Sequence, residues 1–393
     1  MNAPPGALAR DADALAWLGD LLGGGGTGDG GERWAVLPSA ARPRVLVPLG
    51  ARRAAAAVLD RDTGFGGRGR RLAALPFRFG VTPPGLGGRL AVPAGGSFTG
   101  WVADLLGETD LRAGVTIGPP RPNRKPVVQL VREDGTTAAW AKVACNPLTT
   151  GLVANEGRWL DVVARHRPAD VEAPTVTARG RWRDHDVLIT APLPTRDRTA
   201  AFRPDAALLT AVSGLDAGGE QAATGSPWWA ATVERAAAVA TPGAADVLAG
   251  ALDALSRRLD GATWAFGAWH GDLTRWNATV AGPTTQVWDW ERATSDRPVG
   301  FDAAHAAFQE AQVAERRTVA DAATAAEAAS APVLVDLGID PATAPELVTA
   351  YLLERVLRWD EDARLGSPTP TDERHRAILA AILARCSRSG VHR

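Results

Sequence analysis

Lysine and cysteine are both scarce in this chain of 393 residues. Of its 43 basic residues only Lys125 and Lys142 are lysines, so nearly every cation is an arginine. A lysine in such a chain is a candidate for a place where a compact ammonium works and a planar guanidinium does not. The two cysteines, Cys145 and Cys386, cannot form a disulfide framework, and with six scattered histidines they show no zinc-ligand spacing. We therefore expect a reducing, cytoplasmic setting.

Strong charge of one sign and long apolar runs are also missing. The formal net charge of -1 gives neither the basic field of a nucleic-acid binder nor a strong acidic field. The region of Arg10, Asp11 and Asp13 is charged where a secretory signal needs an unbroken apolar core, and no later run approaches ~18 uncharged apolar residues. We expect no nucleic-acid partner, no export and no membrane insertion. With 46% hydrophobic residues the chain can bury a sizeable core.

Residues 1–95 are expected to form an appended N-terminal subdomain. The pattern predicts an amphipathic helix over 8–22, strands at 34–38 and 43–49, a helix at 51–59 and an apolar segment at 70–79. The stretch from Gly23 to Gly28 spells G-x-G-x-x-G. No strand precedes it and no helix starts from it, so we interpret it as a flexible linker.

Residues 96–193 are predicted to form a nucleotide-binding lobe. We expect helices at 98–106 and 153–165, and strands at 112–118, 126–131, 137–143, 176–181 and 187–193. The turn Glu133-Asp134-Gly135 favours a hairpin between the second and third of these strands. Lys142 lies at the end of the third strand, and Glu156 lies on the helix that follows.

Residues 194–393 are predicted to form a mainly helical lobe. Residues 195–224 look polar and loop-like, and a hairpin is expected to join Asn277–Val280 to Gln286–Asp289. The predicted helices span 228–240, 244–259, 302–329, 345–358 and 373–385.

One stretch of the helical lobe concentrates residues suited to phosphoryl transfer. It contains His270-Gly271-Asp272, then Asn277 five residues after Asp272, and Asp289 at the end of a short predicted strand. Asp272 is a candidate to accept the proton of a substrate hydroxyl, or to orient that hydroxyl. Asn277 and Asp289 supply oxygens suited to magnesium. His270 is expected to lock the loop by hydrogen bonding and is grouped with Asp272 as catalytic.

The predicted nucleotide-binding lobe supplies complementary candidates. Phosphoryl transfer depends mostly on positioning and charge cancellation. Lys142 can hold the non-transferred phosphates of ATP, and Glu156 is the expected ion-pair partner that fixes its side chain. Adenine is expected against the strand at 187–191, with hydrogen bonds from the backbone near Ala191 to Leu193.

With these residues together, the chain resembles the aminoglycoside phosphotransferase and choline kinase branch of the protein-kinase-like superfamily. His270-Gly271-Asp272, Asn277 and Asp289-Trp290-Glu291 look like that branch's catalytic loop and metal-binding segment. The resemblance implies an α+β, bilobal kinase-like fold with an antiparallel-sheet N-lobe and a mainly helical C-lobe, here with an extra N-terminal subdomain. It also implies ATP and Mg2+ as cofactors and Asp302 as a residue that caps the next helix.

The departures from protein kinases bear on the substrate. Gly271 stands where protein kinases have an arginine, Glu291 stands where they have a glycine, and no Ala-Pro-Glu follows. A protein substrate is therefore disfavoured. Glu291 either reaches the metal or substrate or is a surface or salt-bridge residue.

The loop at residues 118–125 lacks the glycine pattern of protein kinases. It either clasps phosphates, through Asn123, Arg124 or Lys125, or forms a solvated basic turn. The Asp360-Glu361-Asp362 run is expected to be a solvated helix end, with contact to a cationic substrate as the alternative.

These observations predict an ATP- and Mg-dependent phosphotransferase acting on a hydroxyl of a small molecule. A sugar, an aminoglycoside-like compound and an amino alcohol all remain open as acceptors. The alternative is a non-catalytic, ATP-sensing module that acts through a protein partner. The sequence leaves the oligomeric state undetermined.

Overall fold

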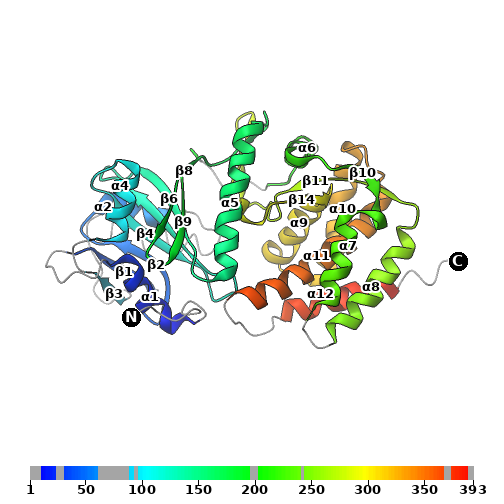
Figure 1. Cartoon of the computed structure of the whole chain (residues 1–393), viewed down its shortest axis with the longest axis horizontal. Coiled ribbons are helices and arrows are strands. Elements are labelled where there is room, and N and C mark those ends of the chain that lie inside the picture. The colour runs from blue at the N-terminus through cyan, green and yellow to red at the C-terminus, as the bar shows by residue number, and fades with distance from the viewer. Residues whose placement is uncertain are drawn as a thin grey trace. The chain divides into compact units, whose positions relative to one another are not determined.

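The chain divides into two units. The computed structural model describes residues 10–23, 31–60, 88–92, 96–194, 202–239, 243–366 and 373–387. The first unit comprises residues 1–157, 174–194 and 365–369, and the second comprises residues 158–173, 195–364 and 370–393. Figure 1 labels the helices and strands of both units. Residues 24–28 of the expected linker and the apolar segment at 70–79 lie outside the described residues.

An antiparallel sheet of eight strands dominates the first unit. Its order is β3-β1-β2-β4-β5-β6-β9-β8, and every neighbouring pair is antiparallel. β2 pairs with β4, so the sheet continues across residue 95, where a subdomain boundary was predicted. The strands are β1 (Arg33–Ser39), β2 (Arg42–Pro48), β3 (Gly88–Ala91), β4 (Arg112–Ile117), β5 (Pro126–Val131), β6 (Thr137–Val143), β8 (Val176–Trp182) and β9 (His185–Thr190).

Helices cover both faces of the sheet at β1. Side chains alternate between the two faces of a strand, so Trp34 and Val36 share one face while Ala35 and Leu37 share the other. Trp34 and Val36 belong to a buried cluster with residues of α1 (Asp11–Leu22) and α4 (Phe98–Leu106). Ala35 and Leu37 pack in a second cluster with α2 (Arg52–Asp60). The nearly continuous apolar runs of β1 and β2 are explained by this burial on both sides.

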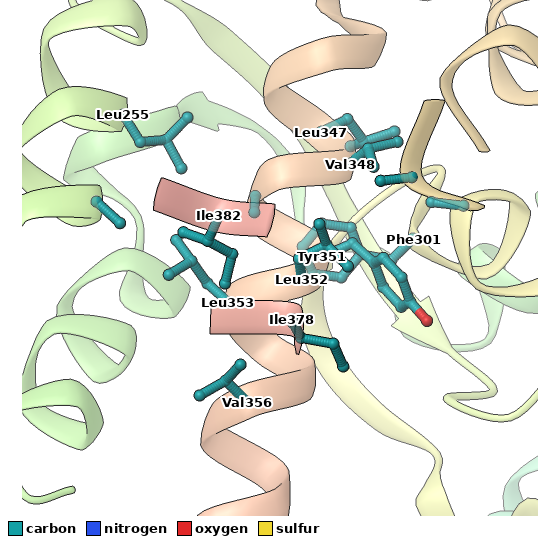
Figure 2. Close-up of a cluster of buried hydrophobic side chains, with 14 of the residues drawn as sticks. Leu255, Phe301, Leu347, Val348, Tyr351, Leu352, Leu353, Val356, Ile378 and Ile382 are labelled. Atoms are coloured by element: carbon teal, nitrogen blue, oxygen red, sulfur yellow. The ribbon is translucent and has the colours of Figure 1, made fainter. Parts of the chain in front are cut away.

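The second unit is mainly helical and is built around α11 (Ala344–Leu365). Figure 2 shows apolar side chains of α11, among them Leu352, Leu353 and Val356, within a buried cluster to which Phe301 and Ile382 also belong. The other helices are α6 (Ala206–Ser213), α7 (Pro227–Ala237), α8 (Ala244–Arg258), α9 (Phe301–Gln309), α10 (Val319–Asp336) and α12 (Glu373–Ser387).

Two small sheets of the second unit place the polar loop. The first has the order β10 (Gly219–Ala222), β11 (Thr263–Trp269) and β14 (Thr294–Pro298), and β11 ends immediately before His270. The second contains the predicted hairpin, formed by β12 (Ala278–Ala281) and β13 (Thr284–Val287). β13 also pairs in parallel with β7 (Val171–Glu172).

Two sequence predictions for the second unit are wrong. The helix predicted over 302–329 is interrupted after α9 by a π-helical turn, Glu310–Ala314, and by the left-handed residue Arg316. No glycine or proline lies at this break, so the alanine-rich pattern predicted one continuous helix. The segment 195–224 contains α6, whose N-cap Asp205 accepts a hydrogen bond from the backbone of Leu208.

The α+β class, with an antiparallel-sheet unit and a mainly helical unit, is confirmed. The α5 helix (Pro147–His166) follows β6, as the predicted helix at 153–165 required. Among the helices that the structure describes, none has both the length and the apolar composition needed to cross a membrane.

Candidate functional site

The first unit brings Lys142 and Glu156 together. The Lys142 Nζ lies 2.7 Å from Oε1 and 2.6 Å from Oε2 of Glu156. Along β6 the side chains of Ala139, Ala141 and Val143 are buried in the core. Because side chains alternate along a strand, the Lys142 side chain points from the opposite face of the sheet. Its side chain is 17% exposed, against 4% for Glu156. The lysine is thus held in place and still partly accessible.

Gly157 explains how α5 comes close enough to the sheet for this ion pair. A Cβ at Gly157 would lie 3.0 Å from the Arg179 side chain and 3.3 Å from the Leu188 side chain. Arg179 donates a hydrogen bond of 2.8 Å to the Gly157 carbonyl oxygen. A larger residue beside Glu156 would push α5 away from β8 and β9.

In the loop between β4 and β5, Arg124 and Lys125 are buried, whereas Pro119, Pro120 and Arg121 are exposed. Arg124 is fully buried and donates to Asp11 Oδ1 of α1 at 2.8 Å, while Lys125 is 8% exposed. Cys145 Sγ donates to the Arg124 carbonyl oxygen at 3.1 Å. The interpretation as a solvated basic turn is therefore wrong for Arg124, which pairs with Asp11 of α1, and for the buried Lys125.

The segment after β9 carries the backbone groups predicted to bind adenine. The Ala191 N–H donates to the Thr175 carbonyl oxygen at 2.8 Å. Its N–H is therefore occupied, and any contact of Ala191 with a ligand would involve its carbonyl oxygen. Leu193 lies two residues further on, within the described residues.

In the second unit, Asp302 and Arg358 hold the backbone of the loop after β11. Asp302 accepts hydrogen bonds from the backbone N–H groups of His270 and Gly271, at 2.7 and 3.1 Å. Arg358 donates to the Gly271 carbonyl oxygen at 2.8 Å and stacks over the Trp269 ring at 5.2 Å. The expected helix-capping role of Asp302 is wrong, because Gly300 occupies the N-cap of α9. Burial raises the pKa of Asp302 to about 6.

Gly271 is required by the backbone itself. Its φ is +78°, a left-handed conformation that side chains rarely adopt, and an added Cβ would lie 2.4 Å from the Arg292 carbonyl oxygen. The absence of an arginine here is therefore a consequence of loop geometry. Whether this glycine also disfavours a protein substrate stays a prediction.

The His270 ring is fully buried and joins the loop to the segment before Asp289. Its Nε2 lies 3.1 Å from the Trp288 carbonyl oxygen, and its Nδ1 accepts the backbone N–H of Asp272 at 3.2 Å. The ring also packs edge-on against Trp290, with centroids 4.7 Å apart. These contacts fit the locking role, and the burial leaves no ring surface for a substrate.

Asp272 presents a fixed carboxylate. Asn277 Nδ2 donates to Oδ2 at 2.8 Å and to the Asp272 carbonyl oxygen at 2.9 Å, while His305 Nε2 lies 3.0 Å from Oδ1. The side chain is 41% exposed. Desolvation is the largest influence and works to raise the pKa of Asp272. The hydrogen bond and electrostatic attraction from His305, together with the charge of Arg358, outweigh it, so the pKa lies below its usual value. Asp272 is therefore ionised at neutral pH.

His305 and Tyr351 are functional candidates that the sequence motifs missed. His305 Nδ1 lies 3.0 Å from the Tyr351 hydroxyl, and both side chains are fully buried. Burial lowers the pKa of His305 to about 4 and raises that of Tyr351 to about 12, so both are neutral. Two signals pointed to them. His305 follows Asp302 by one helical turn, and Tyr351 is the chain's single tyrosine.

Asn277, Asp289 and Glu291 offer oxygens to a cation. Carboxylate oxygens of Asp289 and Glu291 lie within 4.8 Å of one another. Asn277 uses its Nδ2 toward Asp272, and its backbone carbonyl accepts the Trp288 N–H at 3.0 Å. Asp289 adopts a left-handed conformation, φ +69°, at the start of the turn Trp290–Arg292. Two close carboxylates and an amide oxygen on adjoining segments fit a hard cation such as Mg2+. Glu291 is buried, so its interpretation as a surface residue is wrong.

The acidic run on α11 is engaged in ion pairs. Asp362 accepts two hydrogen bonds from Arg292, at 2.7 and 2.5 Å, and Glu361 accepts two from Arg235, at 2.6 and 3.0 Å. Asp360 lies 3.1 Å from the Arg364 guanidinium. The expected solvated helix end is therefore wrong. The Asp362 pair fixes Arg292, whose carbonyl oxygen lies against Gly271.

Comparison with known proteins shows similarity in structure and none in sequence. No protein-family model matches the chain, and no curated protein matches it. The aminoglycoside phosphotransferase APH(4)-Ia, a thermostable mutant in complex with ADP and hygromycin B, is 16% identical, with a TM-score of 0.46 over 75% of this chain and 99% of that one. Choline kinase LicA from Streptococcus pneumoniae is 11% identical, with a TM-score of 0.47 over 74% and 97%.

A third similar structure is the amicoumacin kinase hAmiN in complex with AMP-PNP, Ca2+ and its ligand. It is 11% identical, with a TM-score of 0.41 over 70% of this chain and 88% of that one. The resemblance to this branch of kinases, first indicated by the motifs, stays a prediction for this chain, and these three proteins are structures to which it is similar. The roles proposed below rest on the contacts of this chain's own residues.

Proposed function

We propose that this protein is an ATP- and Mg-dependent phosphotransferase that moves the γ-phosphate of ATP to a hydroxyl of a small molecule. The observation that carries the proposal is the Asp272 carboxylate. It is ionised, partly exposed and held at one oxygen by Asn277 and at the other by His305. A carboxylate fixed in this way, next to a set of oxygens suited to a cation, matches the needs of phosphoryl transfer.

Residues of the first unit would hold the nucleotide. Lys142, oriented by Glu156, would neutralise charge on the non-transferred phosphates. The carbonyl of Ala191 and the backbone of Leu193 would contact adenine. Lys125 is the remaining proposed phosphate contact, and its burial requires that the loop rearrange for such contact.

Residues of the second unit would hold the metal and the acceptor. Asn277 and Asp289, together with Glu291, would bind Mg2+, which supplies neutralisation of charge on the phosphate oxygens. Asp272 would accept a hydrogen bond from the acceptor hydroxyl. As the acceptor oxygen bonds to the γ-phosphorus and the bond to the β-phosphate oxygen breaks, the hydroxyl proton passes to Asp272 and ADP leaves.

His270 is proposed as a positioning residue. Its ring connects the Asp272 backbone N–H to the Trp288 carbonyl oxygen, so it sets the spacing between the proposed base and the proposed metal ligand Asp289. Loss of this link would move the two acidic groups relative to each other. The effect would fall on turnover, since errors of about 1 Å in such geometry cost about 10²-fold in rate.

The acceptor is proposed to be a sugar, an aminoglycoside-like compound or an amino alcohol. Asp360, Glu361 and Asp362 are already paired with arginines, which argues against this run as the recognition site for a cationic acceptor. An ATP-consuming enzyme with free cysteines at 145 and 386 fits a cytoplasmic location.

The test uses purified protein, radiolabelled ATP, Mg2+ and a panel of these acceptors. The wild type is expected to transfer phosphate to at least one acceptor. Asp289→Ala should lose Mg-dependent ATP binding, whereas Asp272→Asn should retain binding and turn over ~10²-fold more slowly or worse. Equal loss of nucleotide binding in both variants would contradict the assigned roles.

A second candidate function is an ATP-sensing module that lacks catalysis and acts through a protein partner. The buried contact of Arg124 with Asp11 favours it, because it links the β4–β5 loop to α1 in the N-terminal subdomain proposed for residues 1–95. Thermal stabilisation by ATP without turnover on the acceptor panel would support this candidate. Phosphate transfer that depends on Asp272 would exclude it.

A further inference from the structure

Tyr351, His305 and Asp272 form one chain of hydrogen bonds. His305 Nε2 lies 3.0 Å from Oδ1 of Asp272, and His305 Nδ1 lies 3.0 Å from the Tyr351 hydroxyl. An ionised carboxylate can only accept, so Nε2 carries the proton and donates it to Asp272. In the neutral ring, Nδ1 is then an acceptor and takes a hydrogen bond from the Tyr351 hydroxyl. The chain therefore runs in a single direction, from Tyr351 through His305 to Asp272.

The surroundings of Tyr351 keep this chain rigid. Its ring packs edge-on against Phe301, Phe308 and His305, with centroids 6.2, 5.8 and 5.7 Å apart. Figure 2 shows Tyr351 extending from α11 with its hydroxyl oxygen directed away from the helix. Only Asp272 is partly exposed, whereas His305 and Tyr351 are fully buried. Neither can reach an acceptor, and both act through Asp272.

We infer that His305, oriented by Tyr351, is a positioning residue that fixes the Asp272 carboxylate for the acceptor hydroxyl. This inference rests on the proposed function. Asn277 holds Oδ2 and His305 holds Oδ1, so rotation of the carboxylate is stopped from both sides. Each oxygen keeps one further lone pair for the acceptor. Such orientation contributes to turnover and should leave ATP affinity unchanged, because it acts on the Asp272 carboxylate and not on the groups proposed to hold ATP.

The test compares two substitutions of His305. The amide of His305→Gln can place an N–H donor near the former Nε2, whereas His305→Leu fills the space without a donor. We expect kcat to fall about 10²-fold in His305→Leu and to be largely restored in His305→Gln, with KM for ATP within about twofold in both. Tyr351→Phe should lower kcat less, and it should add nothing to His305→Leu because the two residues act in series.

Phe308→Leu is the matched control for loss of packing. Phe308 is buried on the same helix as His305 and contacts Tyr351, but it makes none of the hydrogen bonds of the chain. This variant should melt at a lower temperature than the wild type and keep kcat within about threefold. An equal fall of kcat in Phe308→Leu and His305→Leu would overturn the inference, because general loosening of the core would then explain both.

A spectroscopic test does not depend on activity. In 15N-histidine-labelled protein, the resonances that disappear in His305→Gln belong to His305. At pH 7 we expect a neutral ring with its proton on Nε2. A proton on Nδ1, or a doubly protonated ring, would overturn the inferred chain.

The failure of this inference can be separated from the failure of the proposed function. An active wild type with an equally active His305→Leu rejects the positioning role alone. A wild type that transfers no phosphate rejects the proposed function, and the positioning role with it. If His305→Leu does not fold, Tyr351→Phe replaces it in the test, and an unchanged kcat there would reject the inference.

Discussion

Substitution of Gly271 by alanine should distort the loop that carries Asp272. Two effects act at this position. The left-handed backbone costs an L-residue roughly 1–2 kcal/mol, and a Cβ 2.4 Å from the Arg292 carbonyl oxygen forces either the loop or Arg292 to move. Overpacking of this kind typically costs about 1–3 kcal/mol. We therefore expect Gly271→Ala to lower the free energy of unfolding by about 2–5 kcal/mol.

Gly282 offers a matched control in the β12–β13 turn. It has a similar left-handed backbone, φ +68°, but an added Cβ would meet nothing within 4 Å. Gly282→Ala should therefore show the backbone cost alone, roughly 1–2 kcal/mol. Denaturant unfolding measures both variants.

The same pair of variants tests the link from loop geometry to catalysis. A shift of about 1 Å at Asp272 should reduce kcat about 10²-fold in Gly271→Ala, whereas Gly282→Ala should stay close to wild type. Equal stability and equal turnover of the two variants would refute the steric account of Gly271.

Three further predictions concern both units. Lys142→Met should weaken ATP binding at least tenfold, as isothermal titration would show, and should also lower the unfolding midpoint, because the buried Glu156 loses its ion pair with Lys142. Chelation of Mg2+ by EDTA should abolish transfer, and restored Mg2+ should recover it; transfer that persists in EDTA would exclude the metal role of Asp289. His305 binds a proton below pH 6.5 in the unfolded protein but only below about pH 4 in the folded protein. The free energy of unfolding should therefore fall by about 3 kcal/mol as the pH is lowered through this range. Asp302 changes stability in the opposite direction as the pH falls, because its pKa in the folded protein is raised to about 6. The contribution of His305 is therefore measured as the difference in stability between wild type and His305→Gln across this pH range.

The residues that the sequence revealed lie close together along the chain. Asp272 and Asn277 are five residues apart, and a short hairpin brings Asp289 back to them. Lys142 and Glu156 are 14 residues apart, on a strand and the helix that follows it. Local periodicity is enough to predict that such residues lie near one another, because a short segment can join them in only a few conformations.

The residues that the sequence did not reveal come from distant helices. His305 meets Asp272 across 33 residues, and Arg358 meets Gly271 across 87. Their positions depend on how α9 and α11 pack in the core, and periodicity predicts that a helix has a buried face without naming its partner. Asp302 was assigned to a helix cap for the same reason. Its contact with the loop backbone is tertiary.

Charge patterns were misleading wherever the partner was remote. The run Asp360-Glu361-Asp362 looked like a solvated helix end, yet Arg235 and Arg292 pair with two of its members from 126 and 70 residues away. The basic loop at Arg124 and Lys125 was likewise expected to be solvated or bound to phosphate. Arg124 is instead buried and paired with Asp11 of α1, so it is not solvated, and the phosphate contact of Lys125 stays a prediction.

The most direct measurement of the central claim is phosphate transfer from radiolabelled ATP, in the presence of Mg2+, to the acceptor panel by wild type and Asp272→Asn side by side. The account predicts a labelled acceptor with the wild type and at least ~10²-fold slower labelling with Asp272→Asn, at equal ATP binding. Labelling at the same rate by both proteins would contradict it, as would a wild type that binds ATP and labels no acceptor.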